Sequence, residues 1–180
     1  MRAIAGLMLV GALVSVPLAA GDRFAASGGD IEITPFLHSS IQLEHAGVVI
    51  QVDPWSAADL SKAKMADVIL ITDDPVHHLD PVAIKRLRKP SAPVIMPASG
   101  KAKIPDGIVL ANGASTTAAG VRVDSIAAYD LTPGDPAHPK GEASGYLITL
   151  GGKTFVLDQP VRGPTPVYGT PVTAAFPGVV

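Results

Sequence analysis

Short stretches in which apolar and polar residues alternate run through the whole chain. Isoleucine and leucine alternate with polar residues at 30–34 and 41–43, and residues 48–52 form a β-branched run. This period of two predicts three short strands, the second and third joined by a turn at Ala46-Gly47. Further strands are expected at residues 68–71, 94–96, 108–111, 121–126, 146–150 and 154–157, the last two joined by a tight Gly151-Gly152 turn.

One helix is indicated clearly, and it begins at Asp80-Pro81. The aspartate can cap the first turn, the proline suits the first helical position, and the apolar residues of 81–88 fall on one side. Residues 56–66 give only a weak indication, of either a helix or a loop. Loops are expected at residues 132–144 and 160–171, which are rich in proline and glycine.

The first residues resemble an export signal. Arg2 supplies a charge, residues 4–16 are apolar or small, and Ala19-Ala20-Gly21 resembles a cleavage site. We expect a signal peptide at residues 1–21 and one domain at residues 22–180, in a periplasmic or secreted protein that keeps no stable membrane anchor after processing. The alternative is a membrane anchor, which the early end of the apolar stretch disfavours.

Composition narrows the chemistry. The chain has no cysteine, so a metal ion would have to be held by histidine and carboxylate groups. Its formal net charge of −2 gives no reason to expect nucleic acid as a partner, and the basic cluster at residues 85–89 suits the end of a helix. A small-molecule substrate is the expected partner if the protein is an enzyme.

Candidate ligands gather just after the strand at residues 68–71. The sequence VILITDDPVHHLD places Asp73, His77, His78 and Asp80 in the loop that follows this strand. Other candidates in loops or at strand ends are His38, His138 and Asp158. Metal-bound water has a pKa lowered to about 7, which makes hydroxide available for hydrolysis. From spacing alone, ordinary exposed loop histidines and a helix cap are the favoured interpretation, with metal binding as the alternative.

Several blocks together resemble a known family. They are TPFLHSSIQLEH, VIQVDPW, VILITDDPVHHLDPVAI, AHPKG and SGYLITLGGKTFVLD. Their order is similar to that of the metallo-β-lactamase-fold hydrolases, in particular the secreted L-ascorbate-6-phosphate lactonase-like group. The resemblance implies an α/β protein with an αβ/βα sandwich, here incomplete at its C-terminal end.

The family motif T-H-x-H-x-D-H-L-D is only partly kept. Asp73 takes the first ligand position, Pro75 replaces the second histidine, and His77 replaces the aspartate, while His78 is retained. Leu157-Asp158-Gln159 replaces the family's G-D-T, which keeps the carboxylate. The motif is therefore degenerate, and it leaves room for one ion rather than two.

The resemblance implies a set of roles for these residues. Asp73, His77, His78 and Asp158 are expected to hold zinc or another divalent metal, with His77 and His38 in catalysis. His138, Asp80 and Asp53 are expected to contact substrate or support the ligands, and Asp80 is expected to orient His78.

Two functions stay open at this stage. One is metal-dependent hydrolysis of an ester, lactone or phosphodiester. The other is a non-catalytic relative that serves as a binding or scaffold protein. An uncovered sheet edge would also favour self-association.

Overall fold

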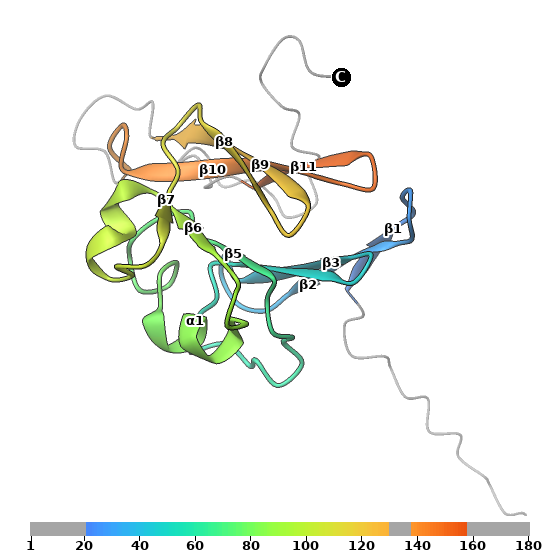
Figure 1. The fold of residues 1–180 in the computed structure, drawn as a ribbon. Coiled ribbons are helices and arrows are strands. Elements are labelled where there is room, and N and C mark those ends of the chain that lie inside the picture. Colours follow the sequence, from blue (N-terminus) through green and yellow to red (C-terminus); the bar gives the residue numbers. More distant parts are fainter. Residues whose placement is uncertain (1–20, 130–137, 158–180) are drawn as a thin grey trace, which may run out of the picture.

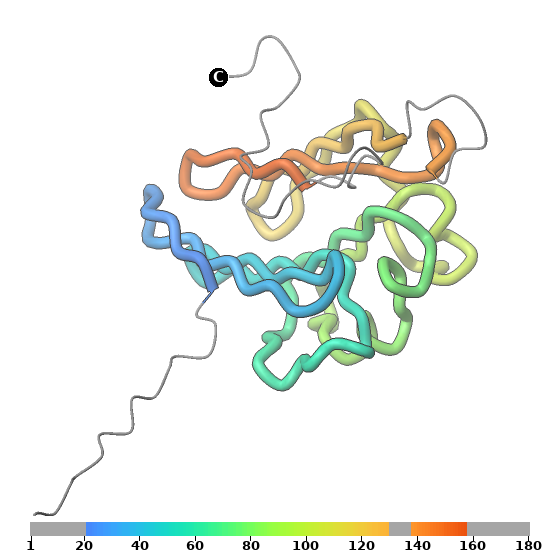
Figure 2. The backbone as a smooth tube through the Cα atoms, turned by 180° about the vertical axis from the view of Figure 1, so that it is seen from behind, coloured from blue at the N-terminus to red at the C-terminus, as the bar shows by residue number. Residues whose placement is uncertain are grey.

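The computed structural model describes residues 21–129 and 138–157, which form two β-sheets stacked face to face (Figure 1). The first sheet contains β1 (Asp22–Phe24), β2 (Ile31–Pro35), β3 (Ile41–His45), β4 (Val48–Val52), β5 (Val68–Leu70), β6 (Val94–Met96) and β7 (Ile108–Val109) in chain order. The second contains β8 (Ser115–Ala118), β9 (Val121–Ala128), β10 (Ala143–Leu150) and β11 (Lys153–Leu157), in the order β11-β10-β9-β8. Seen from behind, the strands β1 to β7 make one layer and the strands β8 to β11 the other (Figure 2).

Strand direction changes within the first sheet. β1 to β4 pair antiparallel, whereas β4 to β7 pair parallel. Parallel neighbours need a crossover, and α1 (Pro81–Leu87) and the 3₁₀ helix η1 (Ala98–Ala102) lie in the crossovers that follow β5 and β6. α1 lies on the side of this sheet that faces away from the second sheet (Figure 1).

The hydrophobic core follows from the alternation of the strands. Val68 and Leu70 of β5 face the second sheet and meet β10 side chains such as Ile148. Ile69 and Ile71 point to the opposite face and pack in a second cluster that includes Leu79, Ile84, Met96 and Ile104. β5 is therefore buried on both faces, which explains its unbroken apolar sequence.

The second sheet also anchors the C-terminal end of β5. The buried Tyr146 hydroxyl donates to the Ile71 carbonyl at 2.7 Å, and the Ser144 amide donates to the Thr72 carbonyl at 2.8 Å. Burial raises the pKa of Tyr146, so this hydroxyl keeps its proton. Because these bonds join β10 to the residues just after β5, they fix the start of the loop that carries the candidate ligands.

Most strands expected from the sequence are confirmed, as is the helix at Asp80-Pro81. The turns at Ala46-Gly47 and Gly151-Gly152 are confirmed too, and all four residues have positive φ. Residues 56–66 form turns and no helix. The strands β1 and β8 and the helix η1 were not predicted.

Three expectations concern residues that the structure does not describe. The signal peptide and the loop at residues 160–171 lie outside the described residues, as do residues 132–137 of the loop expected at residues 132–144. Of the rest of that loop, residues 138–142 are irregular and residues 143 and 144 begin β10. None of the helices within residues 21–129 and 138–157 has the length and apolar character needed to cross a membrane.

Asp80 stabilises the start of α1. Its carboxylate accepts from the amides of Val82 at 2.8 Å and Ala83 at 3.4 Å, and also from the amide of Ser56 at 2.8 Å. Burial acts to raise the pKa of Asp80, but these hydrogen bonds outweigh it and lower the pKa below the ordinary value. Asp80 therefore caps the helix as predicted and ties the loop at residues 56–66 to it.

We expect Asp80→Ala to lower the free energy of unfolding at pH 7 by about 1–2 kcal/mol, since the cap is lost. Because the pKa is lowered in the folded state, this contribution is present above the unfolded pKa of about 3.9 and is lost as the pH falls through the folded pKa. Urea unfolding at several pH values measures both effects. Asp80→Asn, which keeps an acceptor, should cost less; equal stability of wild type and Asp80→Ala at pH 7 would contradict this assignment.

Candidate metal centre

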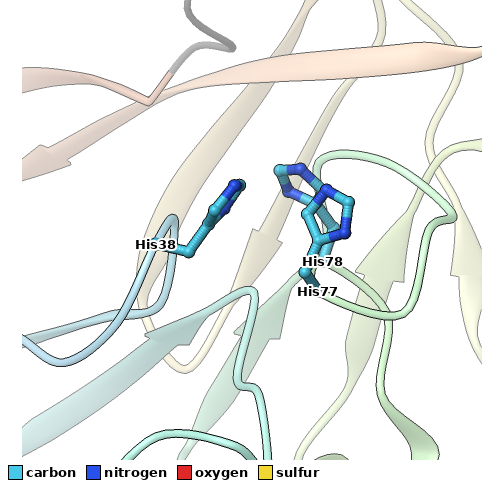
Figure 3. Close-up of side chains that lie close together, drawn as sticks. All are labelled: His38, His77 and His78. Atoms are coloured by element: carbon cyan, nitrogen blue, oxygen red, sulfur yellow. The ribbon is translucent and has the colours of Figure 1, made fainter.

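Three histidines meet at the end of the first sheet where β2 and β5 terminate. His38 lies in the loop between β2 and β3, and His77 and His78 lie in the loop after β5. Each offers a ring nitrogen within 4.8 Å of the others. The ring centroid of His77 lies 4.6 Å from that of His38 and 4.5 Å from that of His78. Figure 3 shows the His38 ring facing the other two across the gap between the loops. We call these three residues the histidine cluster.

A tight loop holds His38. The Phe36 amide donates to the Ser40 carbonyl and the Ser40 amide donates to the Leu37 carbonyl, both at 2.9 Å. His38 itself adopts a φ of +57°, the left-handed region that non-glycine residues rarely occupy. Such a conformation costs on the order of 1 kcal/mol and persists only where the surroundings enforce it.

A second turn presents His77 and His78. The Pro75 carbonyl accepts from the amides of His78 and Leu79, both at 2.8 Å. Pro75 has no side-chain donor atom for a metal, but its carbonyl closes the turn that sets the two imidazoles side by side. The residue that removes one family ligand therefore takes part in positioning two others.

Asp53 supports His78 from behind. This buried carboxylate lies 2.7 Å from Nδ1 of His78 and accepts from the Thr72 amide at 2.8 Å and the Thr72 hydroxyl at 2.5 Å. Its backbone also has a positive φ, +44°. An imidazole whose Nδ1 donates to a carboxylate presents Nε2 to a metal, which is the usual arrangement behind a histidine ligand.

The expectation for Asp80 needs correction on this point. Asp80 was expected to orient His78 through a ring nitrogen, but the carboxylate found at Nδ1 is that of Asp53. The reason is that both oxygens of Asp80 receive backbone amides at the start of α1 and at Ser56. Asp53, also expected to support the site, takes that place.

The remaining predicted ligands do not join the cluster in the described residues. Asp73 is buried, but one of its oxygens accepts from the Asp74 amide and the other lies 3.6 Å from Nε2 of His138. Asp158 lies outside the described residues. His77 and His78 thus come together as predicted, whereas the third member is His38, which the sequence suggested for catalysis rather than ligation.

The electrostatics of the cluster favour neutral imidazole at His77. Burial lowers its pKa, and the neighbouring imidazoles of His78 and His38 lower it further, while Asp73 and Asp53 act in the opposite direction. Neutral imidazole is the form that ligates a metal. Trp55 adds an aromatic wall, its ring meeting His38 edge-on at 6.3 Å and His77 at 6.2 Å.

These residues fit a divalent metal ion. Three imidazoles with a water in the fourth position form an established zinc ligand set. A carboxylate orients one of the three, and neutral imidazole is favoured at another. The arrangement could hold one ion and leave a position for water.

Comparison with known proteins identifies the class. Residues 32–157 match the family described as the Beta-lactamase superfamily domain. A protein from Parabacteroides distasonis, assigned as a metal-dependent hydrolase, is 35% identical with a TM-score of 0.71, and the match covers 76% of this chain and 64% of that one. The chain belongs to the metallo-β-lactamase superfamily. The predicted superfamily and fold class are thereby confirmed.

More distant structures show the fold alone. Igni18, a metallo hydrolase from Ignicoccus hospitalis, is 22% identical with a TM-score of 0.52 over 69% of this chain and 57% of its own. CmlA, a diiron β-hydroxylase from Streptomyces venezuelae, is 13% identical with a TM-score of 0.55 over 79% and 30%. A search of curated proteins found no match. The chain spans less than two thirds of the Parabacteroides distasonis protein.

We expect Asp53→Ala to lower the free energy of unfolding by about 3 kcal/mol, because a buried hydrogen-bonded group is removed and its donors stay behind. Asp53→Asn is the matched control: it tolerates the left-handed backbone and keeps an oxygen for the Thr72 amide, so its cost should be smaller. Urea unfolding of the metal-free proteins measures the difference. A loss below about 1 kcal/mol for Asp53→Ala would show that this network contributes little.

Proposed function

We propose that this protein is an exported hydrolase that uses one divalent metal ion, zinc in the first instance, held by His38, His77 and His78. The carrying observation is that these three imidazoles converge from two loops while Asp53 supports one of them. Membership of the metallo-β-lactamase superfamily and the likeness to a metal-dependent hydrolase support the same reaction class.

The substrate class proposed is an ester, lactone or phosphodiester. When bound, the metal ion supplies an activated water and polarises the bond under attack. The protein's own part is to hold three imidazoles in place and to keep Asp53 on the side of His78 away from the ion. Asp73 and His138 form a carboxylate–imidazole pair, and Asp73 also acts electrostatically on His77. Both residues are therefore candidates to contact substrate or to accept a proton.

Two further parts of the proposal come from the sequence. The leader at residues 1–21 supports export to the periplasm or beyond, and the similarity of the motif blocks supports the L-ascorbate-6-phosphate lactonase-like group.

The expected self-association through an uncovered strand edge is a proposal as well. Size-exclusion chromatography of the mature chain tests that last point, and a monomer would contradict it.

A second candidate function is a binding protein that keeps the fold without the reaction. Pro75 stands where the family has a ligand, and Asp73 lies against His138 instead of joining the cluster. Both observations fit a site that has lost ligands.

Metal analysis of the purified mature chain separates the two functions. We expect about one equivalent of zinc after dialysis, lost in His78→Ala and in His38→Asn, the latter chosen because asparagine tolerates a left-handed backbone. His45→Ala, in β3 and outside the cluster, should retain the metal.

Hydrolysis of p-nitrophenyl esters, a lactone or bis-p-nitrophenyl phosphate should stop with a chelator and return with zinc.

A folded chain that takes up no zinc, manganese or iron would instead favour the binding protein. The same conclusion would follow if metal bound equally well to the wild type and to His78→Ala.

A further inference from the structure

Ser39 lies between the two loops that form the histidine cluster. Its hydroxyl oxygen is 3.3 Å from Nδ1 of His38 and 3.1 Å from Nδ1 of His78. It also donates to the main-chain carbonyl of His77 at 3.4 Å. One half-buried hydroxyl therefore contacts all three residues of the histidine cluster. Two of them, His77 and His78, lie 38 and 39 residues further along the chain than Ser39.

Counting hydrogens assigns the direction of each contact. A hydroxyl has one hydrogen to donate and two lone pairs that accept. The His77 carbonyl can only accept, and the hydrogen of the Ser39 hydroxyl is assigned to it. With the hydroxyl hydrogen so placed, the contact with His38 uses an oxygen lone pair of Ser39 and a hydrogen on Nδ1 of His38. Nδ1 of His78 has a single hydrogen, which is directed to the nearer Asp53 carboxylate at 2.7 Å, so its 3.1 Å contact with Ser39 is secondary.

Asp53 provides an independent check on this assignment. Its carboxylate accepts from the Thr72 hydroxyl and lies 2.7 Å from Nδ1 of His78, so that nitrogen carries a hydrogen whatever Ser39 does. The His78 tautomer is thus fixed by Asp53. Within the described part of the chain, Nδ1 of His38 meets the hydroxyl of Ser39 instead of a carboxylate.

We propose that Ser39 is a positioning residue that keeps the hydrogen of His38 on Nδ1, so that Nε2 of His38 is available to the same ion as Nε2 of His78. The proposal rests on the metal site of the proposed function and adds to it a residue outside the predicted ligand set. It also accounts for the approach of the two loops, because the bond from Ser39 to the His77 carbonyl ties the His38 loop to the loop after β5.

The arrangement disfavours Ser39 as a nucleophile. A nucleophilic serine passes its proton to a base, usually an imidazole nitrogen with a lone pair. Here the hydroxyl hydrogen is assigned to a carbonyl, and Nδ1 of each neighbouring imidazole carries a hydrogen, so neither has a lone pair to accept the serine proton. Covalent labelling of Ser39 by a fluorophosphonate would overturn the proposal.

Nitrogen-15 NMR of the full metal-free mature chain tests the tautomers directly, at about pH 8.5, which is about two units above the ordinary imidazole pKa. In the wild type, we expect Nδ1 to be protonated in both His38 and His78. In Ser39→Ala, His38 should shift toward the Nε2-protonated form while His78, held by Asp53, keeps its tautomer. Ser39→Thr retains a hydroxyl and should restore the wild-type spectrum of His38.

Zinc affinity provides the second readout. We expect Ser39→Ala to weaken zinc binding about 10–100-fold, the usual effect of removing a group that orients a ligand. Ser39→Thr should stay within about threefold of wild type. Ser99→Ala is the matched control, since the Ser99 hydroxyl also donates to a carbonyl of another loop, that of Glu142, but does not contact the cluster.

Either of two NMR results would overturn the proposal: a wild-type His38 protonated on Nε2, or a His38 tautomer unchanged in Ser39→Ala. If the wild type takes up no metal, the proposed function fails, and the tautomer of His38 still decides the role of Ser39. If zinc binds with the same affinity to wild type and Ser39→Ala, Ser39 has no positioning role.

Discussion

The contact between Asp53 and His78 is the interaction on which the site depends. It joins the residue after β4 to the loop after β5, and the carboxylate also receives the amide and hydroxyl of Thr72. Burying these groups is favourable only while they remain paired. Asp53 meets this requirement in a left-handed backbone conformation, which shows how strongly the surrounding structure determines its position.

The second sheet makes this arrangement rigid. β10 reaches across the core, where Tyr146 and Ser144 bind the carbonyls of Ile71 and Thr72. The loop with His77 and His78 therefore starts from a point held by both sheets, whereas His38 comes from a short turn held by its own backbone and by Ser39. A rigid pair of ligands with a third on a separate turn is a workable design for one metal ion.

Local patterns predicted the fold well where they were strong. The alternation at β2 and β3, the apolar run of β5 and the Asp80-Pro81 start of α1 all lie where the sequence indicated. β8 was missed because its sequence, Ser-Thr-Thr-Ala, carries little hydrophobic signal. Its turn at Ala119-Gly120, with positive φ at both residues, repeats the Ala-Gly pattern that was recognised at residues 46–47. The site was harder, because Asp53 and Ser39 support His78 across 25 and 39 positions, contacts that only the folded chain reveals.

Retained and replaced residues together give a site that differs from its family motif. Pro75 has no side-chain atom that could bind a metal, and Asp73 lies against His138 rather than in the histidine cluster. His38 is the third member of the cluster instead. X-ray absorption spectroscopy of the zinc-loaded mature chain tests this most directly. The account predicts three imidazole nitrogens at about 2.0–2.1 Å from zinc, falling to two in His38→Asn. A first shell dominated by carboxylate oxygen, or unchanged by that substitution, would contradict it.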